Sequence, residues 1–174
     1  MSVTSARNQA EALVDALGIR AIPVDVEGIA RTLGLQIVFT SLEQDVSGVL
    51  ITGPQGSCIA IRREDVKTRQ RFSIAHELGH YCLRHQFEAG GHVHVDKGYA
   101  FSKRSGKSST GTDIKEIEAN QFGASLLMPS KLVRERIRTL NTDELYDSHV
   151  TALSHEFQVS EQAMTIRLSA LGLL

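Results

Sequence analysis

His76-Glu77-Leu78-Gly79-His80 is the stretch of this 174-residue sequence from which fold and chemistry can be worked out. The apolar spacing around it predicts one long helix from about Asp65 to Arg84. Histidines four residues apart lie about 40° apart around a helix, so both rings can reach one ion. A glutamate directly after the first histidine suits proton transfer rather than metal binding. The stretch therefore predicts a zinc-dependent peptidase in which His76 and His80 bind Zn2+ and Glu77 is catalytic.

A catalytic zinc site needs a third protein ligand and leaves one position for water. His85 points about 140° away from His80 around the helix, so it is a poor candidate. A second helix, expected over 113–128, carries Glu116 and Glu118. Glu116 shares a face with Asn120, whose amide could hydrogen-bond a ligating histidine, and it is the preferred ligand. Glu118 remains an alternative, although it could be solvated at a helix edge, and acids in a first turn also complement the helix dipole.

Apolar periodicity and turn residues divide the remaining chain into short elements. We expect helices over 6–17, from Asp25 to before Gly34, over 130–138, and two in the tail that meet at 158–160, with Ser160 as an N-cap. Strands are expected over 35–39, 46–52 and 57–62. This order predicts an α+β fold, mainly helical and zincin-like, with a small antiparallel sheet and a C-terminal helical hairpin. We expect a metallopeptidase domain over 1–140 and a helix-turn-helix-like segment over 141–174 packed on it.

Composition is that of an ordinary globular protein, with 41% apolar residues, 22% charged residues and a net charge of −1. This balance gives no sign of a broad polyanion-binding surface. The sequence has no apolar run long enough to cross a membrane and no secretory signal at its start, so we expect a cytoplasmic protein without membrane contact. Cys58 and Cys82 are expected to be free thiols, with Cys82 a small core residue.

Two stretches resemble the ImmA/IrrE family of zinc metallopeptidases, which are HExxH gluzincin-like enzymes. Residues 70–80 look like the metal helix of that family, and 116–129 look like its second-ligand helix. Further similarity at 22–30, 46–50 and 157–164 extends the resemblance over nearly the whole chain. The resemblance implies His76 and His80 as ligands and Glu77 as acid/base, and it supports Glu116. It also implies a partner, a helix-turn-helix repressor that the enzyme cleaves or inactivates.

Several features have both a functional and a structural explanation. The family commonly has alanine where this chain has Gly123, and residues 86–112 have no clear counterpart. His92 and His94 alternate with valines in that segment, so they either line a substrate cleft or lie on a surface strand. The last helix has Arg167 as its single basic residue, so direct DNA binding is not expected. The basic helix over 130–138 is expected to be a solvated face or a docking surface.

Two functions from different classes follow from these observations. The first is a regulatory endopeptidase that cleaves a helix-turn-helix transcriptional repressor. The second is a catalytically weak zinc-fold module that docks to a repressor or toxin partner, or senses metal or redox state. Glu77 favours the enzyme, because a binding module has no need of a proton carrier at this position.

Overall fold

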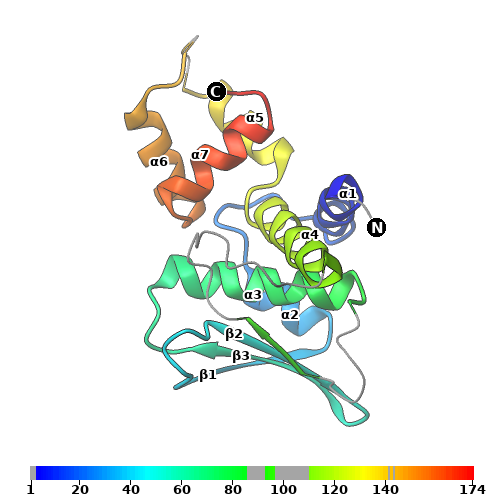
Figure 1. Cartoon of the computed structure of the whole chain (residues 1–174). Helices are drawn as coiled ribbons and strands as arrows, with labels where there is room; N and C mark the ends of the chain where they lie inside the picture. The colour runs from blue at the N-terminus through cyan, green and yellow to red at the C-terminus, as the bar shows by residue number, and fades with distance from the viewer. Residues whose placement is uncertain (1–2, 86–92, 97–109, 141, 143) are drawn as a thin grey trace.

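The computed structural model describes residues 3–85, 93–96, 110–140, 142 and 144–174 (Figure 1). Helices dominate, and the predicted α+β class is confirmed. In chain order the elements are α1 (Val3–Ala16), α2 (Val26–Thr32), β1 (Leu35–Thr40), β2 (Gly48–Gly53), β3 (Gly56–Arg62), α3 (Lys67–Cys82), β4 (Val93–Asp96), α4 (Thr110–Leu127), α5 (Ser130–Arg138), α6 (Asp147–Phe157) and α7 (Glu161–Ala170). The predicted caps are present, since Asp25 accepts from Gly28 and Ser160 accepts from Ala163.

The sheet is mixed, with strand order β1-β3-β2-β4, so the expectation of an antiparallel sheet was wrong. β2 and β3 form the predicted antiparallel hairpin. β1 lies on the other side of β3 and runs parallel to it, with Leu35 opposite Ser57. The physical reason is simple. The chain reverses between β1 and β2 and again between β2 and β3, so β3 regains the direction of β1.

The predicted segment around His92 and His94 is described only in part. β4 pairs antiparallel with β2, and Leu50 lies opposite His94. A strand therefore occurs close to where alternation suggested one. His92 lies outside the described residues, as does most of 86–112, and only the backbone of β4 is described.

The helix α3 lies across one face of the sheet, α4 packs against the side of α3 that faces away from the sheet, and α1 packs against α4 (Figure 1). From Ser73 to His80 every residue of α3 is buried. Ile74 and Leu78 of α3 and Ile59 of β3 belong to this core, with at most 1% exposure each. Burying side chains of this kind stabilises the fold by roughly 1.5–3 kcal/mol each. A helix enclosed on both sides has a rigid backbone, which suits it to hold metal ligands.

Basic side chains fasten the C-terminal helices to the rest of the molecule. Arg167 on α7 is 4% exposed and donates to the carbonyl of Met128 at 2.9 Å and to the carboxylate of Glu11 at 2.7 Å. On α5, Arg134 donates to the carbonyl of Leu171 at 2.9 Å. Arg136 forms an ion pair with Glu156 of α6. The helix over 130–138 is therefore more than a solvated face, because two of its cations hold the tail.

Two further expectations from the sequence can be checked against this fold. Cys82 is partly buried and packs against the core, in keeping with the small core residue that was expected. Within the part of the chain that the structure describes, no helix has the length and apolar character needed to span a bilayer.

Candidate metal centre

Three side chains from two helices converge at the C-terminal half of α3. The Nε2 atoms of His76 and His80 lie 2.9 Å apart. The Glu116 carboxylate of α4 approaches both rings, at 3.3 Å from His76 Nε2 and 3.5 Å from His80 Nε2. The histidine side chains are buried, and that of Glu116 is 20% exposed. His76, His80 and Glu116 thus form a donor triad that could hold a metal ion, with one partly open side.

The donor triad fits zinc in both chemistry and size. Two imidazoles and a carboxylate are a known set of catalytic zinc ligands, with bonds of about 2.0–2.2 Å. Tetrahedral bonds of that length place neighbouring donor atoms roughly 3.3 Å apart. The observed separations of 2.9, 3.3 and 3.5 Å lie around this value. A cation between the two Nε2 atoms would attract both lone pairs.

Small residues beside the ligands bring the two helices together. Gly79 of α3 faces Ala119 of α4 so closely that a Cβ on the glycine would lie 3.0 Å from the Ala119 Cα. Gly123 faces the backbone of Ala75, where a Cβ would lie 3.2 Å from the carbonyl carbon. Ordinary carbon contacts are about 3.5–4.0 Å, so larger residues would separate the helices. The close approach lets the short carboxylate side chain of Glu116 reach histidines on the other helix.

Asn120 orients His76 from the side away from the donor triad. Its Oδ1 atom lies 2.9 Å from His76 Nδ1. An amide oxygen accepts, so Nδ1 carries the proton and Nε2 keeps its lone pair for a metal. The hydrogen bond follows from the helical repeat, because Glu116 and Asn120 share one face of α4. This is the arrangement that the sequence suggested for Asn120.

Glu77 is fully buried on α3 beside the histidines. Gly48, the first residue of β2, makes room for its carboxylate. A Cβ at position 48 would lie 3.1 Å from Glu77 Oε1 and 3.3 Å from its Cγ. The strand and the helix together enclose this carboxylate, which lies on the same stretch of α3 as the two histidines.

A chain of two hydrogen bonds reaches His80 at Nδ1, the ring nitrogen that faces away from the donor triad. His80 Nδ1 lies 2.9 Å from His85 Nδ1, and His85 Nε2 lies 3.1 Å from the Glu118 carboxylate. The side chains of His85 and Glu118 are 5% and 4% exposed. Burial lowers the pKa of His85, although the hydrogen bond and charge of Glu118 act in the opposite direction. Burial is the larger of these effects.

The end of α3 explains how His85 comes back to the site. Arg84 adopts the left-handed conformation, with φ of 54°. The His85 amide donates to the His80 carbonyl at 3.0 Å, and the Arg84 amide donates to Tyr81 at 3.1 Å. These two bonds are a Schellman motif, which usually has glycine at the left-handed position. The reversal brings His85 against His80, although straight helical geometry would point it away.

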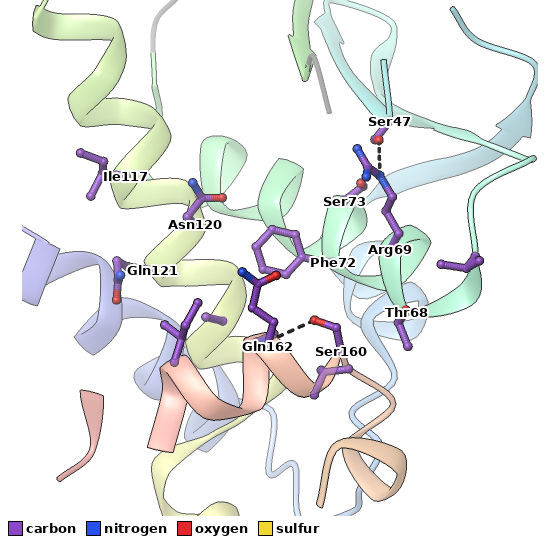
Figure 2. Close-up of a pocket in the computed structure, with 15 residues that line it drawn as sticks. Ser47, Thr68, Arg69, Phe72, Ser73, Ile117, Asn120, Gln121, Ser160 and Gln162 are labelled. Atoms are coloured by element: carbon purple, nitrogen blue, oxygen red, sulfur yellow. Dashed lines mark hydrogen bonds between the residues drawn. The ribbon is translucent and has the colours of Figure 1, made fainter. Parts of the chain in front are cut away.

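A pocket of about 540 Å³ opens between α3, α4 and α7 (Figure 2), and none of the three donor side chains lines it. Asn120 belongs both to its lining and to the surroundings of His76. Phe72 and Ser73 contribute from α3, one turn before the ligands. Ile117 of α4 and Ile166 of α7 also line it and are each 46% exposed. The pocket therefore offers a largely apolar surface that is linked to the candidate metal site through Asn120 and His76.

Comparison with known proteins agrees with this geometry. The model of the peptidase M78 family, the IrrE N-terminal-like domain, matches residues 30–169. The chain belongs to this family. The IrrE-like domain has no significant match among curated proteins. Among solved structures it is similar to a Mycobacterium tuberculosis transcriptional regulator, with a TM-score of 0.63, 16% identity and 97% of this chain covered. It spans 47% of the length of that protein, and at this identity the likeness concerns the fold.

The IrrE-like fold brings together most of the residues that the sequence singled out. His76, His80 and Glu116 form the donor triad, with Glu77 and Asn120 beside it. Glu118 lies outside the triad and is buried against His85, so its suggested place at a solvated helix edge was wrong.

Sequence reasoning dismissed His85 as a ligand and assigned it no other role. One signal for a role of His85 was available in the sequence. Glu118 is a second acid in a predicted helix whose other residues are largely apolar or small. Its burial called for a cationic or hydrogen-donating partner. The chain reverses at Arg84, which is left-handed, and brings His85 to the site. Such a position usually has glycine, so nothing in the sequence indicated this turn.

Proposed function

We propose that this IrrE-like domain is a zinc-dependent regulatory endopeptidase that cleaves a helix-turn-helix transcriptional repressor. The observation that carries the proposal is the donor triad with a buried glutamate beside it. The family is one of metal-dependent peptidases, which supports hydrolysis as the class of reaction. A repressor as target places the proposed reaction in the cytoplasm.

The side chains divide the work of peptide hydrolysis in a definite way. His76, His80 and Glu116 would hold the ion, and Asn120 would keep His76 in the tautomer that presents Nε2. Zinc, when bound, lowers the pKa of water to about 7 and polarises a carbonyl. Glu77 would accept a proton from the attacking water on its carboxylate and deliver it to the nitrogen of the departing amine. Its burial in a low-dielectric site strengthens these interactions.

The pocket between α3, α4 and α7 supports a peptide as substrate. Its lining is largely apolar, and one lining residue, Asn120, contacts His76 of the donor triad. A side chain next to the cleaved bond could enter it, with Ile117 and Ile166 as apolar contacts. Binding energy from such a side chain would position the bond that is cut. We therefore expect a preference for bulky apolar residues beside the cleavage point.

A repressor target agrees with the arrangement of the tail. The side chain of Arg167, the basic residue of α7, is turned inward to Glu11 and is not presented to DNA phosphates. In the proposal, DNA binding is therefore left to the partner. The described role of the M. tuberculosis protein in transcription is compatible with such a partner. The division at residue 140 stays a prediction, and the pocket takes residues from both sides of it.

Incubation with the cognate repressor tests the proposal. Purified protein and repressor are mixed with and without a chelator, and intact masses are measured. We expect a single metal-dependent cut in an exposed linker, and no cut with Glu77→Gln at unchanged metal content. Bound metal is measured separately by elemental analysis, with about one zinc per chain expected. A repressor that stays intact but binds tightly and loses its DNA affinity would support the docking module instead.

A further inference from the structure

The buried chain from Glu118 through His85 to His80 has only one polarity that suits a metal ligand. A carboxylate accepts hydrogen bonds, so His85 donates from Nε2 to Glu118. The second ring nitrogen of His85, Nδ1, is then the acceptor for the Nδ1–H of His80. His80 is left with its lone pair on Nε2, the atom that faces Glu116.

The two ligating histidines are therefore supported differently. His76 donates to a neutral amide oxygen, that of Asn120. His80 donates to an imidazole that is itself bonded to a carboxylate. Negative charge at the end of such a chain makes His80 Nε2 the more basic donor. The near-complete burial of His85 and Glu118 protects this interaction from screening by water.

We propose that Glu118 and His85 are positioning residues that hold His80 in the Nδ1–H tautomer and so set the affinity of the site for its metal. The proposal rests on the proposed metal site. It assigns a role to the acid that the sequence left as an alternative ligand. Loss of partners of this kind lowers metal affinity by roughly 10–100-fold.

The first test needs no metal. Long-range proton–nitrogen NMR spectra of the metal-free protein report which ring nitrogen of each histidine carries the proton. We expect Nδ1–H for His80 and Nε2–H for His85, and a mixture of tautomers for His80 in His85→Leu. His85→Gln should restore the single His80 tautomer, because its amide can accept from His80 and donate to Glu118. An Nε2–H tautomer of His80 in the wild type would overturn the proposal.

The second test measures zinc affinity by competition with a chromogenic chelator. We expect about a 10-fold loss for Glu118→Gln, up to a 100-fold loss for His85→Leu, and partial recovery in His85→Gln. Glu135→Gln, an exposed glutamate on α5, is the matched control and should leave affinity unchanged. Circular dichroism checks that each variant is folded.

The two measurements separate the two proposals. Equal affinity of Glu118→Gln, His85→Leu and the control would refute the role of the pair while the metal site stands. If the wild type binds no zinc, the proposed function fails. The tautomers of the metal-free protein still decide whether Glu118 and His85 fix His80.

Discussion

Replacement of Gly79 by alanine should damage the metal site more than the fold. A Cβ at position 79 would lie 3.0 Å from both the Cα and the carbonyl oxygen of Ala119, and 3.2 Å from the Phe122 Cβ. Because contacts between carbon atoms are comfortable at about 3.5–4.0 Å, α4 would have to retreat by a few tenths of an ångström. The obstructing atoms include backbone, so a side-chain rotation cannot relieve the contact.

Two opposing terms set the effect of Gly79→Ala on stability. Overpacking a buried contact costs about 1–3 kcal/mol, whereas alanine in place of a helical glycine gains about 1 kcal/mol. The net loss in the free energy of unfolding is therefore about 1 kcal/mol. The metal site has no such compensation. A retreat of α4 lengthens the 3.3 and 3.5 Å separations between Glu116 and the histidines beyond the roughly 3.3 Å of a tetrahedral set of donors, which weakens the hold on the ion.

Urea denaturation of the metal-free protein measures the first effect, and chelator competition measures the second. We expect a loss of about 1 kcal/mol in stability and at least a 10-fold loss in zinc affinity. Gly53→Ala is the matched control, since a Cβ there would meet its nearest atom at 3.9 Å. The reasoning is refuted if Gly79→Ala unfolds at higher urea than the wild type and binds zinc equally well.

Two further predictions concern the pocket and the thiols. Ile166→Asp puts a charge on the pocket wall. We expect a raised KM for a substrate with an apolar side chain beside the cleaved bond, at unchanged zinc content. An unchanged KM would contradict the proposed use of the pocket. Burial raises the pKa of Cys82 to about 11, so at pH 8 only about one thiol in a thousand is ionised. Its alkylation by iodoacetamide, followed by mass spectrometry, should be slow at pH 8 and rise about tenfold per pH unit up to that pKa; fast labelling at pH 8 would contradict this environment and favour a redox role.

The parts of the site that follow the helical repeat could be predicted from the sequence. His76 and His80 are one turn apart on α3, and Glu116 and Asn120 are one turn apart on α4. Each pair shares a face for the same geometric reason. A two-helix site of this kind needs only that the two faces meet. The choice of Glu116 over Glu118 as the member of the donor triad also followed from this repeat.

The parts that depend on tertiary structure or on an unmarked turn could not be predicted. The parallel pairing of β1 with β3 depends on where the edge strands lie, and the hairpin signal does not fix that. Cations on the 130–138 helix looked solvated because their partners Glu156 and Leu171 are far along the chain. His85 was expected to point away from His80, because the left-handed turn at Arg84 lacks the glycine that usually identifies such a turn in a sequence.

The same repeat sets both the packing and the chemistry of this domain. On α3 the small residues Ala75 and Gly79 each precede a histidine of the donor triad, and on α4 Ala119 precedes Asn120. The small residues allow the helices to touch, and the neighbouring polar residues then meet across the contact. Packing alone would allow apolar residues in place of the polar ones. Their burial at the tightest point of the core is unfavourable unless each finds a partner, so a metal ion that these groups could hold accounts for them better than stability does.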